Sequence, residues 1–431
     1  MSGKVGDNLF RASGLVKAVA AGRTGTVDWC TTAKTSPFTA TTAEGYFVNT
    51  TCGSITVTLP SSPSAGDIVS LKDYADTWDS NSVTLGRGGS KISGNCNDGC
   101  LGTEGQTVTM VYVDGTRGWL NTQTDTTVGG SDFISATGGT ITCCGDYKMH
   151  KFTATGCFAL TQGACAANNN VSYLVVAGGG GGGSNHGGGA GGGGFREGSP
   201  PADPYTASPL AAACSSLPVS TQTYTITVGG GGPAGDPPGN APTGKGTPGT
   251  DSVFSTITST GGGKGSVEGT APAGCAGVGG SGGGGAYTNA TGRAGKAGNC
   301  PPTSPAQGTP GGNSITYPPG SGGGGGGATI AGSTGTPGTA GPGGDGATTS
   351  IIASPTIYAG GGGAGRNIYG SSGGGAGGDG GGGAGSTGAC IAATSGTPNT
   401  GGGGGGGFGS GPGSPGGDGG SGVVIIRYKF Q

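Results

Sequence analysis

The stretch YLVVAGGGGGG at residues 173–183 decides the fold of this chain, because an apolar, strand-like run leads directly into six consecutive glycines. A second tract, seven glycines at 401–407, comes shortly before the apolar run VVII at 423–426. A free oligoglycine tract is a flexible linker, and each glycine that becomes fixed loses a large backbone entropy. Glycine tracts framed by strands must therefore find hydrogen bonds elsewhere in the chain in order to be ordered.

Polyglycine II offers such hydrogen bonds. It is an extended threefold helix without internal hydrogen bonds, so its N–H and C=O groups point outward toward neighbouring helices. Only glycine lets these helices pack backbone against backbone. The one-in-three glycine spacing of a collagen triple helix holds only briefly, at positions 335, 338, 341 and 344 and again at 413, 416, 419 and 422. We therefore predict a lattice of parallel and antiparallel polyglycine-II helices joined by polar loops.

The composition argues against several classes of function. Of the 431 residues, 113 are glycine and only 9% are charged, with a net charge of -2. Nucleic-acid binding is not expected, because the chain has no basic stripe interleaved with aromatic residues. Membrane insertion and an export signal are not expected either, since no apolar stretch approaches the roughly 20 residues of a membrane helix.

The pattern along the chain predicts an all-β protein with almost no α-helix. N-terminal β-sandwich modules are expected to precede a glycine-rich polyglycine-II helix sandwich with flanking β-strands. Short period-two runs such as ITVTL at 55–59, separated by Gly and Pro, are typical of such a β-sandwich. We divide the chain into an attachment arm (1–26), a β-sandwich module (27–123), a small β segment (124–170) and the polyglycine-II domain (171–431).

Two strand pairings can be predicted. Residues 173–176 and 423–428 are apolar runs at the two boundaries of the glycine-rich domain, and pairing them would bury apolar surface that the glycines cannot supply. In the small β segment, residues 147–152 and 157–160 are expected to pair with each other.

The twelve cysteines are even in number and locally clustered, which favours disulfides in a protein that works outside a cell. We predict the bridges Cys96–Cys100 and Cys157–Cys165, because each pair is close in sequence across an expected turn. Zinc is the alternative for Cys96 and Cys100, but no second pair of cysteines or histidines follows at the spacing of a zinc site. A virus particle would reconcile the cysteines with the missing export signal.

Several segments resemble known proteins. The run at 173–183, FREG at 195–198, YTITVG at 224–229 and GVVIIRY at 422–428 together resemble the glycine-rich domain of tailed-phage tail-fibre and virion structural proteins. The stretch from 44 to 119 is similar to a β module of fibre proteins from phages that infect aquatic bacteria. The chain departs from such modules at Cys52, Cys143 and Cys144, where Ser or Thr is usual.

The resemblance implies a fibre-tip adhesin in the virion, extracellular after host lysis, whose exposed loops touch a host-surface glycan or outer-membrane protein. Other virion proteins would hold the N-terminal arm, and a homotrimer is one possible assembly. The alternative is a non-adhesive capsid decoration or tail spacer fibre. Loop aromatics and arginines are the expected receptor-binding residues, since a polyglycine face has no side chains: Phe195, Arg196, Tyr287, Arg293, Tyr317, Arg366, Tyr369 and Phe408.

No catalytic, metal or cofactor site is predicted. The chain has only two histidines, His150 in an expected strand and His186 in an expected glycine loop. Neither a catalytic triad nor a histidine-ligated metal centre is expected from this pair. For His186 an exposed loop position and a receptor contact are both open. Asp73 and two nearby aspartates flank Trp78 and could bind a sugar or form an acid/base pair, although a solvated loop is the simpler interpretation.

Two further functions are not supported by the sequence. Residues 239–246 nearly match a phosphate-binding loop, but Gly246 stands where the magnesium-binding Ser or Thr is required. A depolymerase would need a repetitive β-helix with a carboxylate-lined groove, and no such repeat is seen.

The attachment arm generates a prediction. Residues 1–26 contain too little apolar surface to fold alone, so we expect them to dock on another virion protein. Deleting the arm should leave a folded protein that no longer incorporates into particles, as measured by immunoblotting of purified virions. Normal incorporation of the shortened protein would contradict this role.

Overall fold

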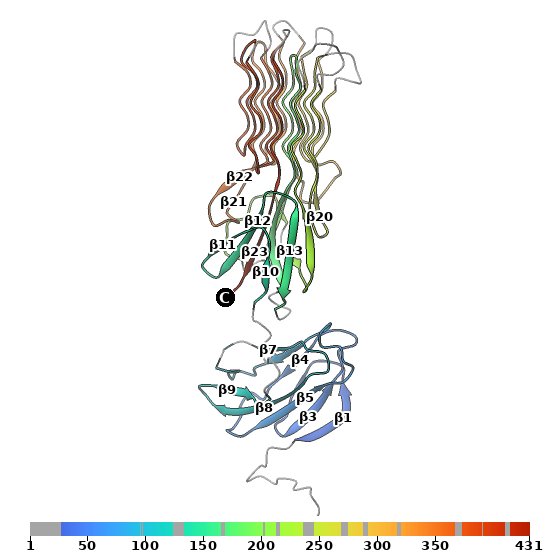
Figure 1. Cartoon of the computed structure of the whole chain (residues 1–431), viewed down its shortest axis with the longest axis vertical. Coiled ribbons are helices and arrows are strands. Elements are labelled where there is room, and N and C mark those ends of the chain that lie inside the picture. The colour runs from blue at the N-terminus through green and yellow to red at the C-terminus, as the bar shows by residue number, and fades with distance from the viewer. Residues whose placement is uncertain are drawn as a thin grey trace, which may run out of the picture. The chain divides into compact units, whose positions relative to one another are not determined.

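The structure is a computed structural model that describes residues 27–94, 96, 98–123, 133–164, 169–200, 203–212, 216–235, 245–268, 275–287, 292–316, 320–366, 373–389, 391–409 and 414–431. They form two compact units, the first containing the described residues up to Phe133 and the second Ile134–Gly163 and Asn169–Gln431. The described residues contain β-strands and extended segments but no α-helix, which confirms the predicted all-β class (Figure 1). The strands at 135–137, 140–144, 147–152 and 156–162, from the segment predicted at 124–170, belong to the second unit.

The first unit is a sandwich of two sheets around one apolar core. The first six strands alternate between the two sheets along the chain, so that β1 pairs with β3, β3 with β5, β2 with β4 and β4 with β6, each time in parallel. One sheet holds β1 (Asp28–Lys34), β3 (Glu44–Val48), β5 (Ile68–Asp73), β8 (Thr107–Asp114) and β9 (Gly118–Asn121). The other holds β2 (Phe38–Thr39), β4 (Ile55–Thr58), β6 (Val83–Gly86) and β7 (Gly99–Leu101).

The second unit begins with a seven-stranded sheet in the order β11-β12-β23-β14-β15-β16, with β17 beside β14. These strands are β11 (Thr140–Cys144), β12 (Tyr147–Phe152), β14 (Asn170–Val176), β15 (Phe195–Gly198), β16 (Ala211–Ala212), β17 (Leu217–Pro218) and β23 (Val423–Lys429). A five-stranded sheet contains β10 (Ser135–Thr137), β13 (Gly156–Gln162), β18 (Thr223–Thr227), β19 (Ser252–Phe254) and β20 (Ile257–Ser259). A hairpin joins β21 (Ala347–Thr349) and β22 (Thr356–Tyr358).

The pairing of the two boundary strands is confirmed. β14 and β23 are antiparallel neighbours, with Tyr173 opposite Ile426 and Val176 opposite Val423. Their inward side chains join Phe195 and the residues of the β21–β22 hairpin in one buried cluster. The pairing predicted between 147–152 and 157–160 is wrong, because β12 pairs with β11 and β23 whereas β13 pairs with β10 and β18.

The glycine tract at 178–183 is a polyglycine-II helix. Its backbone N–H groups donate to three different neighbours in turn: Gly178 and Gly181 to one segment (Thr250 and Thr247), Gly179 and Gly182 to a second (Gly420 and Gly417), Gly180 and Gly183 to a third (Gly191 and Gly188). The N···O distances are 2.9–3.3 Å. A partner that recurs every third residue is the signature of a helix with three residues per turn.

Six neighbours surround this helix. It donates to the three segments above, all antiparallel to it, and its carbonyls accept from three parallel segments at 232–235, 262–265 and 404–407. All six glycines of the tract are buried. In Figure 1 the glycine-rich segments run alongside one another as long threads that extend from the strands. The predicted lattice of parallel and antiparallel helices is therefore confirmed.

The close approach of these backbones requires glycine. A Cβ atom added at Gly182 would lie 1.9 Å from the carbonyl oxygen of Gly405, and one at Gly179 would lie 2.0 Å from that of Gly402. Both clashes are with backbone atoms, which no rotamer change can relieve. The lattice therefore excludes side chains at positions such as Gly179 and Gly182, where the backbone of a neighbouring helix lies against the Cα atom.

The predicted Cys96–Cys100 disulfide is not formed. Cys96 is an exposed free thiol in a turn, whereas Cys100 lies in β7 with a buried side chain, so the two sulfurs lie in different surroundings. Cys157 lies on β13 with an exposed side chain, while Cys165 lies outside the described residues. The Cys157–Cys165 bridge stays a prediction.

We expect Gly182→Ala to destabilise the second unit strongly, because the new methyl group meets a fixed carbonyl. Overpacking of this kind costs about 1–3 kcal/mol or more. Gly373→Ala is the matched control, since the nearest atom to its Cβ is the Thr387 methyl at 3.6 Å. Thermal unfolding followed by circular dichroism should show a large decrease in melting temperature for Gly182→Ala and little change for Gly373→Ala. Equal melting temperatures for the two variants would contradict the lattice geometry.

Candidate functional site

The predicted receptor-binding residues do not form one group. Phe195 and Arg196 lie on β15, where the lattice meets the seven-stranded sheet. The prediction that Phe195 is an exposed loop anchor is wrong, because its side chain is only 1% exposed and packs in the apolar cluster with Leu174 and Val176. Arg196 is half-buried on the same strand. Neither residue is part of a loop between glycine helices.

Four other predicted residues gather around the turn at 184–187, where the central glycine helix reverses direction. The N–H of Tyr287 donates to the carbonyl of His186 at 3.3 Å, and the N–H of Gly409, next to Phe408, donates to the carbonyl of Arg366 at 3.3 Å. Arg293 lies beside Gly285, two residues before Tyr287. We call Tyr287, Arg293, Arg366 and Phe408 the turn cluster. Tyr317 and Tyr369 lie outside the described residues.

The turn itself is held by two consecutive left-handed residues, Asn185 (φ 48°) and His186 (φ 53°). Asn and His tolerate this region better than most residues. The chain then returns antiparallel to the tract it has just left, since Gly183 donates to Gly188 and Gly180 donates to Gly191. The turn therefore connects two buried, antiparallel helices of the lattice as a hairpin.

His186 is a structural residue. Its side chain is 5% exposed, which excludes both the exposed-loop and the receptor-contact interpretations of this histidine. Its Nδ1 lies 2.9 Å from a carboxylate oxygen of Glu268, and its ring packs edge-on against Tyr287 with centroids 5.4 Å apart. Gly409 leaves room for the imidazole, because a Cβ there would lie 1.9 Å from Nε2.

The members of the turn cluster differ in accessibility. Tyr287 is 3% exposed and its ring covers Gly320, so its main role is to close the end of the lattice. Arg293, Arg366 and Phe408 are half-buried and present part of their side chains to solvent. Arg366 donates to the carbonyl of Thr387 at 3.2 Å, and Arg293 donates to the sulfur of Cys275 at 3.4 Å. These fixed arginines can contact a partner without losing much side-chain freedom.

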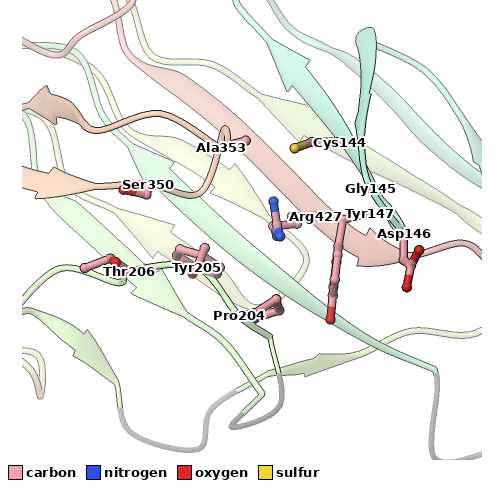
Figure 2. A pocket seen from close by; sticks show the side chains of 10 residues that line it. All are labelled: Cys144, Gly145, Asp146, Tyr147, Pro204, Tyr205, Thr206, Ser350, Ala353 and Arg427. Carbon is pink, nitrogen blue, oxygen red and sulfur yellow. The ribbon is translucent and has the colours of Figure 1, made fainter.

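A cavity of about 540 Å³ lies among the β-strands of the same unit, and sequence reasoning missed it. Figure 2 shows its lining: the turn from β11 to β12 with Asp146 and Tyr147, the segment from Pro204 to Thr206, Ser350, Ala353 and Arg427 of β23. The signal that could have revealed this site is Arg427, a charged residue that directly follows the apolar run at 423–426 in the closing strand.

Arg427 is tightly held at the cavity. Its Nε donates to Asp203 at 2.9 Å, and the two side chains are 5% and 2% exposed. The guanidinium carbon lies 4.3 Å from the ring centroid of Tyr147 and 5.3 Å from that of Tyr205, an arrangement that favours cation–π attraction. Ser172 donates to the other carboxylate oxygen of Asp203. The arrangement therefore combines a buried ion pair with two aromatic rings.

Asp73 and Trp78 do not form an exposed sugar-binding or acid/base pair, because both side chains are buried. Trp78 is fully buried, and its indole N–H donates to the carbonyl of Val48 at 3.2 Å. Asp73 is also buried and accepts hydrogen bonds from the N–H groups of Trp78 and Gly105, both at 3.1 Å. The carboxylate therefore organises a loop, which also corrects the solvated-loop interpretation for Asp73. Within the described ranges, no three His, Cys, Asp or Glu side chains are placed to hold a metal ion.

The pair His186–Glu268 generates a pH prediction. The hydrogen bond from His186 lowers the pKa of Glu268 below its usual value, so the unfolded state binds the proton more readily than the folded state. The stability from this pair is present above the unfolded pKa of about 4.3 and is lost as the pH falls through the lowered folded pKa. Glu268→Gln should lower the melting temperature at pH 7 by roughly 2 °C. On acidification, the melting temperature of this variant should then fall less than that of the parent protein.

The control for this experiment is Asp379→Asn, which changes an exposed carboxylate in the same unit. Thermal unfolding of the parent and both variants from pH 7 to pH 3 would measure the effect. A parent and a Glu268→Gln variant with the same pH profile would show that the pair contributes nothing.

The structure contains no helix long and apolar enough to cross a membrane within the residues it describes. No curated protein matches the chain. A family model described as a glycine-rich domain matches residues 153–429, which include the flanking sheets, the lattice and the closing strand. Because this match covers more than half of the chain, the protein belongs to the glycine-rich domain family.

Proposed function

We propose that the protein is a fibre or fibre-tip protein of a tailed-phage virion and that it binds a receptor on the surface of the host cell. The observation that carries the proposal is the partly exposed arginine and aromatic side chains of the turn cluster at the end of a lattice that is otherwise backbone. The resemblance of several segments to tail-fibre proteins also supports it. No catalysis and no cofactor form part of the proposal.

The lattice suits a supporting role. The central helix at 178–183 has no side chains and uses its backbone groups on its neighbours, so it offers a partner nothing specific to recognise. Each helix is connected to several others, which makes bending or sliding of one segment costly because many hydrogen bonds would break together. Such a body can hold binding residues in fixed positions far from the strands.

The turn cluster suits a recognition role. Arginine and large aromatic residues dominate the energetics of protein interfaces, and here they project from a rigid frame. Arg366 and Phe408 are close in space, since the backbone of Gly409 is hydrogen-bonded to that of Arg366. The receptor would be a glycan or an outer-membrane protein of the host. Other virion proteins would hold residues 1–26, and a homotrimer is one form the fibre could take.

One observation favours the second candidate, a non-adhesive virion protein such as a capsid decoration or tail spacer fibre. Phe195 and Tyr287, two of the expected receptor anchors, are buried and stabilise the fold instead. A lattice with few exposed anchors would serve equally well as a spacer. The two functions differ in whether the isolated protein competes with particles for host cells.

We expect the double variant Arg366→Ala, Phe408→Ala to compete with particles for host cells at least about 30-fold less well than the parent protein, the loss typical of an interface hot spot. Arg196→Ala is the control, because Arg196 is also half-buried but lies on β15 among the strands. The readout is phage adsorption in the presence of purified protein, with circular dichroism to verify folding. A double variant that competes as well as the parent would exclude the turn cluster from recognition.

A further inference from the structure

We propose that the cavity around Arg427 is a second binding site, which takes an uncharged sugar. The site lies among the β-strands of the second unit and shares no residue with the turn cluster. The proposal is therefore independent of the proposed host-receptor role of that cluster.

The cavity has the size and composition of a small-molecule site. Its volume of about 540 Å³ falls in the range of roughly 300–1,000 Å³ that is usual for ligand pockets. Tyr147, Tyr205 and Pro204 give it apolar walls, while Asp146, Thr206 and Ser350 supply polar groups (Figure 2). A sugar ring has an apolar C–H face and a rim of hydroxyl groups, which match these two kinds of lining.

Arg427 is preorganised as a hydrogen-bond donor. Asp203 holds its Nε, and its Nη1 donates to the carbonyl of Ile351 at 3.4 Å. Within the described residues no hydrogen bond is assigned to Nη2, and Arg427 lines the cavity. The Nη2 group can therefore donate to a hydroxyl oxygen of a ligand without rearrangement of the side chain.

The burial of this ion pair also favours a functional role. Placing two charges in the interior is costly, and an apolar pair of similar size often gives equal or greater stability. The side chains of Arg427 and Asp203 are almost completely buried, yet Ile425, two positions earlier on the same face of β23, is apolar, so an apolar residue would suit this face of the strand. A guanidinium held at the wall of a cavity gives a reason for this arrangement.

The charges of the site select an uncharged ligand. Asp203 balances Arg427, while the exposed carboxylate of Asp146 adds a negative charge at the rim. Burial raises the pKa of Tyr147 and of Tyr205, so both phenols are neutral at physiological pH. An anionic ligand would be repelled by Asp146, whereas a sugar hydroxyl can donate to it. The ammonium group of a cationic ligand cannot accept a hydrogen bond from Nη2 of Arg427, whereas a sugar hydroxyl can.

The test is a binding titration of the full chain with methyl glycosides of glucose, galactose and mannose, followed by ligand-observed NMR and calorimetry. At least one glycoside should bind saturably. Asp146→Ala, which removes a hydrogen-bond acceptor, should weaken this binding by about tenfold, and Tyr147→Ala, which removes an apolar wall, should weaken it as well. Glucuronate and choline serve as the anionic and cationic probes and should bind more weakly.

Two controls locate the site. Trp29→Ala removes a 41% exposed aromatic side chain of the first unit and should leave the affinity unchanged. Asp146→Ala should compete for host cells as well as the parent, which separates this site from the turn cluster. The proposal is overturned if no glycoside binds, if Asp146→Ala retains full affinity, if Trp29→Ala abolishes binding, or if glucuronate or choline binds more tightly.

Discussion

The lateral hydrogen bond between glycine helices is the interaction on which the second unit depends. A polyglycine-II helix makes no hydrogen bonds within itself, so every N–H and C=O of the tract at 178–183 is satisfied by another part of the chain. Each bond adds only about 1 kcal/mol net, but leaving a buried backbone group without a partner costs more. The lattice is therefore favourable only when many segments assemble together.

Such an assembly needs a place to begin, and the sheets supply it. β14 and β23 bury Leu174, Val176 and Ile425 in a common core and lead directly into or out of glycine segments. The pairing of these strands fixes the axial position of the glycine segment that follows β14 relative to the one that precedes β23. Apolar burial at one end thus sets the register of hydrogen bonds along the rest of the unit.

The sequence allowed much of this fold to be predicted, because strands and glycine tracts have distinct local patterns. Partner choice was harder to predict. Period-two alternation marks a strand but not its direction, so the parallel stacking of β1, β3 and β5 was not foreseen, and β12 and β13 were paired with each other because they are adjacent in sequence. Side-chain exposure also depends on tertiary contacts: Phe195, Tyr287 and His186 resembled loop residues but are buried. The cavity around Arg427 unites four segments distant in sequence, which no local motif could indicate.

The buried helix at 178–183 has a thermodynamic consequence. Folding an ordinary domain removes apolar surface from water, and the exposure of that surface on unfolding gives a large positive heat capacity change. Here the interior of the lattice consists of peptide groups, and exposing polar surface lowers the heat capacity. The unfolding heat capacity per residue should therefore be unusually small, and the curve of stability against temperature unusually close to a straight line. A protein built in this way would gain stability steadily on cooling and would be far from cold denaturation.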